Sequence, residues 1–420
     1  MCFVKIKPLD FLTFKDGKPF IIGQGFLRKT IFPPTQRTIY GMLRAKILNS
    51  LDVNVEEYVT GKRKDIEEII GSPDWDGESE NGSPCFEIGP LFFLKDDEIY
   101  LPSPMHIFVR KESGKIKECA LANPLVKQNE FMSDLNSLVP AGVVKSSRMS
   151  SDKIPPLIRI KDLIKSLEFN SNSINDDSFL AFFEKPEEDN KNFLAFKSRR
   201  YGIAMDFSLR KVREHHFYLM ETVEFDEATI GFEIKFKNGK KNEMMELLKG
   251  NAKLGGEGRP VTIKIDENFN KHKIEPLKTN ITTNKLLYYL ASPAIYEKGS
   301  FYPDFLELSH NGKTIEGKIP DSSKNVKIRL VSAIVNRAIP VGGWNLSEYI
   351  KSLIKEKKDD YKSPFYGRPI EWAVPAGSVY FFEIIEGNFN DAYELLNCKS
   401  FSKYKKMGLG FGMAGIWKEI

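Results

Sequence analysis

The chain has 420 residues, of which 41% are hydrophobic and 12% aromatic, a composition that is typical of folded proteins and excludes a largely disordered one. One hydrophobic core rarely extends over so many residues, so the length predicts two domains. The net charge of +5 does not by itself indicate a nucleic-acid partner, because local clusters of cations decide the attraction to phosphate.

The four cysteines lie far apart, and none forms a CxxC pair. We therefore expect neither a structural zinc site nor another metal, and this cysteine usage is typical of a reducing cytosol. The first residues alternate like a strand and lack the apolar run of a signal peptide. No uncharged stretch approaches the roughly 20 apolar residues of a membrane helix. The sequence thus predicts a cytoplasmic protein with no membrane partner.

A strand and then a helix are predicted near the start of the chain. Residues 3–8 alternate between apolar and polar side chains, the pattern of a half-buried strand. Thr35 is a candidate N-cap for the helix that follows. The helix spacing predicts a core-facing stripe made of Ile39, Leu43, Ile47 and Leu48. The other face is predicted to present Arg37, Tyr40, Gly41 and Arg44.

Two arginines on that second face are candidate RNA contacts. Arg37 and Arg44 could follow a phosphate backbone, and Gly41 would admit a close approach. The alternative, an ordinary solvated face of an amphipathic helix, is equally compatible with the pattern.

Positive charge is concentrated in residues 197–216, which hold six Lys or Arg residues against two acids. Residues 201–206 and 217–225 are predicted strands on either side of a basic bend. An aromatic side chain inside a basic surface can stack on a base, although a charged edge hairpin is the alternative. We favour RNA contact. The predicted contacts of this segment are Arg199, Arg200, Tyr201, Arg210 and Lys211.

Two glycine-rich runs, residues 254–259 and 408–415, divide the chain in the same way. Each follows a short predicted helix (242–249 and 391–398) and leads into a predicted strand. Glycine permits positive φ and close approach of a ligand to the backbone, so the repetition suggests two copies of one domain type, each with a backbone-lined surface. Taken singly, each run favours a tight turn packed against a neighbouring helix.

Nucleotide-binding loops do not explain these runs. Only eight residues follow Gly412, too few for the helix of a dinucleotide-binding unit, and neither run ends in Gly-Lys-Ser/Thr. Neighbouring cations favour contact with phosphate instead, although the lysines beside the second run are equally compatible with a solvated surface turn. The predicted RNA-binding residues of the two runs are Gly255, Gly256, Gly258, Arg259, Lys405, Lys406, Gly408, Gly410 and Gly412.

The order of predicted elements indicates an α+β fold. The second half repeats the first loosely, with strands at residues 286–291, 326–337 and 378–385 before its helix and glycine run. Each half is compatible with a ferredoxin-like (RRM-like) βαββαβ plan that carries insertions and glycine-rich loops. We expect an N-terminal domain at 1–270, with the basic hairpin, and a C-terminal domain at 271–420.

Catalysis finds little support in the sequence. The five histidines form no HExxH or comparable arrangement. Neighbours such as His215 and His216 would point to opposite faces of a strand, which suits neither one metal nor one acid–base pair. We expect no catalytic residue, no metal and no cofactor.

Several short segments, taken together and in order, make the chain similar to a known family. It resembles the family of the third Cmr protein, a RAMP-superfamily subunit of the type III-B CRISPR (Cmr) effector complex. The matching segments are residues 8–10, 16–20, 32–35, 200–206, 254–259, 292–294, 342–344, 374–379 and 408–415.

The resemblance implies two ferredoxin-like domains and a non-catalytic role. Subunits of this family hold the five-prime handle of the crRNA and bridge the large polymerase-like Cmr subunit to the RAMP backbone subunits, and they meet target RNA indirectly. A basic hairpin that separates handle from guide would correspond to residues 197–216. The alternative is a RAMP-type metal-independent endoribonuclease that processes CRISPR repeat RNA, with His215 or His216 and a nearby lysine as its site.

Overall fold

The structure is a computed structural model. It describes residues 2–15, 27–113, 115–126, 138–143, 149–151, 154–168, 173–174, 194–206, 208–237, 239–267, 283–321, 323–356 and 367–419. Within this part of the chain, no helix has the length and apolar composition that crossing a bilayer requires.

The chain forms two compact units, each assembled from three separate segments. Unit 1 comprises Met1–Lys95, Phe193–Lys271 and Ile339–Trp372, and unit 2 comprises Asp96–Asn192, His272–Ala338 and Ala373–Ile420. Residues 96–192 belong to the predicted N-terminal domain 1–270 but lie in unit 2. Residues 339–372 belong to the predicted C-terminal domain 271–420 but lie in unit 1. The division into two repeated halves stays a prediction.

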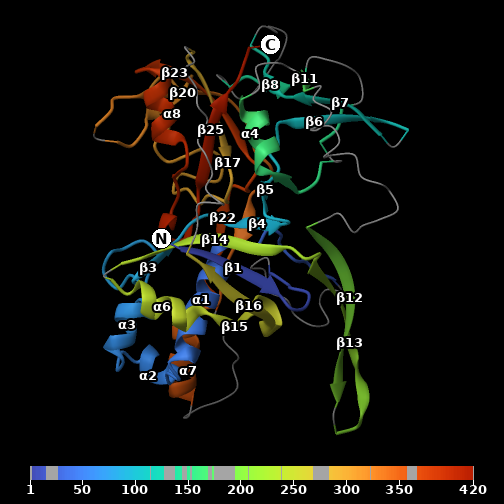
Figure 1. The fold of residues 1–420 in the computed structure, drawn as a ribbon, viewed down its shortest axis with the longest axis vertical. Coiled ribbons are helices and arrows are strands. Elements are labelled where there is room, and N and C mark those ends of the chain that lie inside the picture. Colours follow the sequence, from blue (N-terminus) through green and yellow to red (C-terminus); the bar gives the residue numbers. More distant parts are fainter. Residues whose placement is uncertain are drawn as a thin grey trace. The chain divides into compact units, whose positions relative to one another are not determined.

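An antiparallel sheet forms the centre of unit 1, and β1 lies in its middle (Figure 1). The Val4 backbone pairs with Phe232 on one side and with Ile265 on the other. The side chains of Val4 and Phe232 are fully buried, and that of Ile265 is partly exposed. The alternating pattern of residues 3–8 therefore produced the predicted strand. In spatial order the strands are β4 (Phe92–Lys95), β14 (Thr229–Phe236), β1 (Cys2–Pro8), β16 (Arg259–Asp266) and β15 (Gly250–Leu254), and β3 (Phe86–Ile88) also pairs with β14.

Helices α1 (Gln36–Ser50) and α6 (Lys241–Leu248) contact one another, and α1 also contacts β15. The predicted helices near 36–50 and 242–249 are thereby confirmed. Unit 1 also contains the helices α2 (Val55–Val59), α3 (Lys64–Ile70) and α7 (Leu346–Glu356).

The prediction that Tyr40 belongs to the outer face of this helix is wrong. Tyr40 is buried, its hydroxyl donates to the Phe86 carbonyl, and its ring lies 5.0 Å from the Phe86 ring and 5.8 Å from the Trp75 ring, between centroids. At 3.6 residues per turn, Tyr40 lies about 20° from Ile47 around the helix, so it belongs to the same buried stripe, where the Trp75 and Phe86 rings cover it.

A long hairpin extends from unit 1 (Figure 1). Its strands, β12 (Ala195–Asp206) and β13 (Lys211–Phe225), pair antiparallel along most of their length, and the short strand β2 (Leu27–Arg28) runs parallel to β13. The strands are longer than the sequence predicted, so the basic residues lie on the strands as well as at the bend. Unit 1 also contains the small pair β21 (Ile339–Val341) and β22 (Glu371–Ala373).

The central strands of unit 2 are apolar on both faces. In β17 (Lys285–Leu290) every residue after the first is buried, as expected when both faces of a sheet are covered. Helices α8 (Phe389–Leu396) and α4 (Ile160–Glu168) both contact β25, and Figure 1 shows them on opposite sides of the sheet. The strand order is β18 (Glu307–Leu308), β19 (Ile315–Lys318), β20 (Lys327–Ile334), β23 (Val379–Glu386), β17, β25 (Phe411–Ile416) and β24 (Lys399–Ser400).

The remaining strands of unit 2 come from its first segment. They are β5 (Glu98–Pro102), which pairs with β10 (Leu157–Arg159); β7 (Lys115–Leu121), which pairs with β6 (Ile107–Glu112) and β11 (Ser173–Ile174); and β8 (Asn123–Pro124), which pairs with β9 (Ala141–Gly142). The α+β class predicted from the sequence is confirmed.

In both units a short strand separates the helix from the glycine run. After α6 the chain forms β15, and after α8 it forms β24, before each run leads into the last strand. The sequence missed both short strands. They pair with β16 and β25 respectively, so the repeated order of elements is closer than the sequence indicated.

Candidate nucleic-acid interface

The first glycine run forms a tight loop between β15 and β16. Gly255 and Gly258 have φ values of 75° and 60°, which glycine adopts without the strain that a Cβ would cause. The Gly256 N–H donates to the Thr13 carbonyl at 2.8 Å, and a Cβ on Gly255 would lie 2.5 Å from that same oxygen. The glycines therefore let the loop pack directly against residues 11–14.

Arginines from two strands meet carboxylates at this loop. Arg259 donates from Nη1 to Asp10 at 3.1 Å and from Nη2 to Glu257 at 2.8 Å, and Arg28 donates from Nη1 to the other oxygen of Glu257 at 3.2 Å. Within the described residues, the Nε atoms of both arginines are buried and have no hydrogen-bond partner. The loop is thus lined by guanidinium groups that keep unused donors.

The ring of Phe11 joins this loop to the hairpin. The Arg259 guanidinium carbon lies 3.9 Å from the Phe11 ring centroid, and that of Arg200 lies 4.1 Å from it. Arg200 also pairs with Glu224 at 3.1 Å. Two of the predicted RNA-binding arginines, one from β12 and one from β16, are therefore brought to the same aromatic side chain.

A lysine adds to the positive potential of the cluster. Lys15 has a pKa below the usual lysine value, chiefly because burial disfavours its charged form and secondly because Arg28 lies nearby, while Glu257 acts in the opposite direction.

The hairpin exposes apolar side chains beside its cations. Tyr201 is 75% exposed, and its ring stacks on that of Phe217 at 5.5 Å between centroids, 25° from parallel. Arg199 lies on the same face of β12 as Tyr201, and Arg200 on the opposite face, because strand side chains alternate. Arg210 occupies the tight turn with φ 49°, followed by exposed Lys211. The predicted residues 199–201 are thus distributed over both faces of the hairpin.

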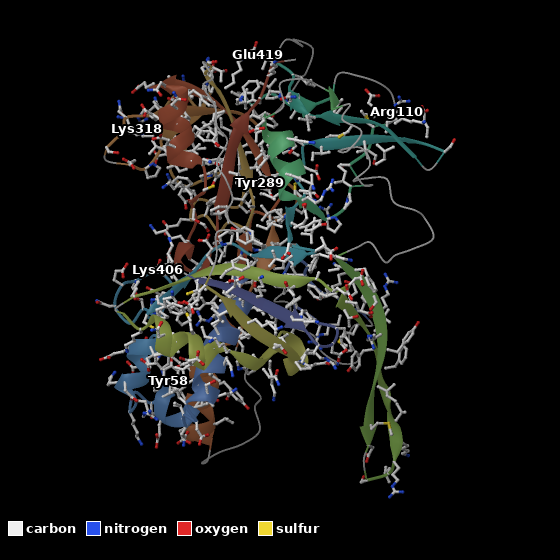
Figure 2. All side chains as sticks on the ribbon, in the orientation of Figure 1. Tyr58, Arg110, Tyr289, Lys318, Lys406 and Glu419 are labelled. Atoms are coloured by element: carbon white, nitrogen blue, oxygen red, sulfur yellow. The ribbon has the colours of Figure 1, made fainter. Side chains whose placement is uncertain are left out.

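Arg37 and Arg44 lie away from this cluster, within the helical part of unit 1. Arg37 forms an ion pair with Glu371. Arg44 donates to the Tyr58 hydroxyl and, at 2.9 Å, to the Ser72 carbonyl; Tyr58 lies among the helices of unit 1 (Figure 2). Both guanidinium groups are thus used in packing contacts.

The second glycine run packs inside unit 2. Gly408, Gly410 and Gly412 are all buried. The Gly408 N–H donates to the Lys405 carbonyl at 3.0 Å and the Gly410 N–H to the Pro293 carbonyl at 2.8 Å. These amides are engaged within the protein, in contrast to the surface role expected of the run. Lys405 is exposed beside them and Lys406 partly so.

Four residues of the loop cluster were not predicted from the sequence: Asp10, Phe11, Arg28 and Glu257. Arg259 and Asp10 are 249 positions apart, and Arg28 and Glu257 are 229 apart. No local spacing marks such pairs. In the described part of the chain, no group of three or more His, Cys, Asp or Glu side chains could hold a metal ion.

Residues 4–417 match the family model described as CRISPR-associated protein (Cas_Cmr3). The chain belongs to this family. The resemblance to the third Cmr protein is therefore confirmed over nearly the whole sequence. The comparison with curated proteins gave no match.

Solved structures of CRISPR effector subunits are similar to this Cas_Cmr3 family member. A chain of the type III-B Cmr-beta complex bound to cognate target RNA is 17% identical, with 98% of this chain and 96% of that chain covered and a TM-score of 0.45. A chain of the same complex with target RNA and AMPPnP is also 17% identical, with coverage of 90% and 86% and a TM-score of 0.43. A chain of the Csm3–Csm4 subcomplex of the type III-A interference complex is 12% identical over 100% of both chains, with a TM-score of 0.36.

Proposed function

We propose that this protein is a non-catalytic, RNA-binding subunit of a type III-B CRISPR effector complex and that it holds the five-prime handle of the crRNA. Its family supports this role. The observation that carries the proposal within the structure is the convergence of Arg200 and Arg259 on Phe11 beside the first glycine loop. Guanidinium groups match phosphate oxygens in geometry.

The hairpin supplies the second element of the proposed interface. Stacked Tyr201 and Phe217 expose aromatic surface next to cations, the combination with which proteins bind single-stranded nucleic acid. A fixed handle would be gripped through phosphates, unstacked bases and 2′-hydroxyls, whereas target recognition would rest on base pairing.

The proposal includes two protein partners. As a member of its family, the chain would bridge the large polymerase-like subunit to the RAMP backbone subunits and would meet target RNA only through the assembly. Isolation of the tagged full-length protein from its native cell, followed by sequencing of bound RNA, tests these points together. Small RNAs with one common five-prime end, together with a large subunit and RAMP partners, are expected. A protein recovered with neither would contradict the proposal.

We also propose that both halves follow a ferredoxin-like plan. In unit 1 the order β4–β14–β1–β16, with α1 after β1 and α6 after β14, supports it. In unit 2 the strand order β20–β23–β17–β25, with α8 after β23, supports it in part. The described residues between β17 and β20 contain short strands and no α-helix, and α4, from an earlier segment, packs on β25 instead.

Absence of turnover is part of the proposal and needs its own test. The purified chain should leave repeat-derived RNA intact both with divalent metal and with EDTA. The alternative, a metal-independent endoribonuclease, requires cleavage that the double variant His215→Ala, His216→Ala abolishes while RNA binding persists. Cleavage with that pattern would replace the non-catalytic assignment by the nuclease.

A further inference from the structure

A single carboxylate connects two arginines at the first glycine loop. Glu257 accepts from Arg28 through one oxygen at 3.2 Å and from Arg259 through the other at 2.8 Å. The arginines come from β2 and from the first position of β16, which are far apart in the sequence. The Glu257 side chain keeps 34% of its surface exposed, so this bridge faces solvent.

The bridge has the chemistry of a bound phosphate. A carboxylate carries one negative charge and two oxygens, and a phosphodiester likewise carries one negative charge on two non-bridging oxygens. Guanidinium forks bind either group with the same donor geometry. Glu257 therefore occupies the position, between Arg28 and Arg259, in which an RNA phosphate would make its strongest contacts.

The backbone of Glu257 has an unusual conformation for a residue with a side chain. Glu257 has φ 63° between glycines 256 and 258, in the left-handed region that costs a residue with a Cβ about 1 kcal/mol. The loop around it is otherwise built from glycine, which would adopt this conformation freely. The carboxylate is thus held on the loop at a conformational cost, directly between the two cations.

We infer that Glu257 is a specificity-determining residue of the RNA site, acting as an internal competitor for phosphate. This inference rests on the proposed RNA-binding function. An incoming RNA must displace the Glu257 carboxylate from Arg28 and Arg259. Weak, unspecific RNA contacts are thereby disfavoured, whereas a handle held at several other points overcomes the competition.

The test compares the isosteric variant Glu257→Gln with wild type in the full-length protein. The probe is a labelled single-stranded oligouridylate of about 20 nucleotides, titrated over a range of salt concentrations. Because one negative charge is removed about 5 Å from a phosphate in water, E257Q should bind roughly three- to tenfold more tightly, and its log–log salt slope should steepen by about one unit. Glu246→Gln is the matched control. Glu246 is an exposed acid on α6 of the same unit, paired with Lys249, so this variant changes the net charge equally and should leave binding unchanged.

If the wild type binds the oligouridylate, unchanged or weaker binding by E257Q, or equal tightening by E246Q, overturns the inference. Weaker binding would mean that Glu257 contacts RNA directly or only supports the loop. Inorganic tripolyphosphate, measured by calorimetry, separates this result from failure of the proposed function. If wild type and E257Q both ignore RNA but E257Q alone gains tripolyphosphate binding, the internal competitor stands and the RNA-binding proposal fails. If E257Q gains neither ligand, the inference fails as well.

Discussion

The guanidinium carbon of Arg259 lies 3.9 Å from the centre of the Phe11 ring. Such a cation–π contact contributes about 0.5–2 kcal/mol, more when it is shielded from water, and Phe11 is only 9% exposed. Since Arg200 lies against the same ring, Phe11 fixes a hairpin cation and a loop cation relative to one another. The ring is therefore the structural link between the two predicted RNA-binding segments.

Replacement of Phe11 by leucine should weaken RNA binding about two- to tenfold, because both guanidinium groups lose the aromatic surface that positions them. Phe11→Tyr keeps the ring and should restore affinity. The effects of F11L and Arg259→Ala should be less than additive in a double-mutant cycle. Fluorescence anisotropy with a labelled oligouridylate provides the affinities, and strictly additive losses would show that Phe11 does not act through Arg259.

Removal of the Arg259 guanidinium by Arg259→Ala should reduce affinity for RNA of any sequence and reduce the log–log salt slope by about one unit, since one phosphate contact is lost. Arg63→Ala is a suitable control, because Arg63 pairs with Asp65 at the start of α3 and lies in the same unit. An unaltered slope for R259A would assign Arg259 a structural role.

Arg44→Ala should lower the free energy of unfolding and leave the log–log salt slope of RNA binding unchanged. Without the guanidinium, the Ser72 carbonyl and the Tyr58 hydroxyl lose a charged donor, at a cost of about 1–3 kcal/mol in the free energy of unfolding. Urea denaturation and RNA titration of the same preparation measure both quantities. A slope reduced by one unit would instead place Arg44 on phosphate.

Acid should destabilise the surroundings of His106 in unit 2. Complete burial lowers the pKa of His106 from 6.5 to about 4, and the ring lies by the Ser166 carbonyl at 3.2 Å. Because the folded-state pKa lies below the unfolded value, the unfolded state binds more protons between pH 6.5 and 4. The stabilisation is complete above pH 6.5 and is lost as the pH falls toward 4, by roughly 3 kcal/mol in all.

Hydrogen exchange at the Ala122 amide, which donates to the His106 carbonyl at 2.7 Å, gives a local measurement of this effect. The opening free energy of wild type should fall more steeply with acid than that of His106→Gln, which has no titrating ring. Parallel pH profiles for the two proteins would contradict the prediction.

Gly410→Ala should destabilise unit 2 by about 3 kcal/mol, because overpacking and a positive φ act together. An added Cβ would lie 2.3 Å from the Ser402 Cβ and 2.7 Å from the Phe401 carbonyl oxygen. Gly312 has a similar φ of 66° with no atom within 4 Å of its added Cβ, so Gly312→Ala isolates the conformational part, about 1 kcal/mol. Thermal unfolding compares the two, and equal losses would show that crowding contributes nothing.

Local periodicity predicted β1 and the helices α1, α6 and α8, because one buried face imposes a period of two on a strand and of 3.6 on a helix. It did not predict the helices α2, α3, α4 and α7. It missed β15, whose residues Gly-Asn-Ala-Lys-Leu have weak strand propensity; pairing with β16 makes it a strand. It misplaced Tyr40, because the aromatic rings that cover it come from positions 75 and 86.

The candidate site could be predicted only in part from the sequence, because several of its contacts join residues that are far apart in the chain. Charge and glycine content marked the hairpin and Arg259, since clusters of like residues are visible along the chain. The pairing of Arg28 with Glu257 and the placement of Phe11 depend on contacts across more than 180 residues. The second glycine run was predicted to lie at the surface, but its glycines are buried in unit 2. Burial depends on the folded unit and cannot be inferred from the run alone.

The three-segment construction of unit 1 has a consequence for its synthesis. Arg37 receives its partner Glu371, and Asp74 its partner Lys351, only when the segment Ile339–Trp372 is present. A ribosome adds about 5–20 residues per second, so α1 waits on the order of half a minute, at an intermediate rate, between leaving the ribosome and gaining its last contacts. During that interval the nascent chain carries a unit 1 that lacks its third segment.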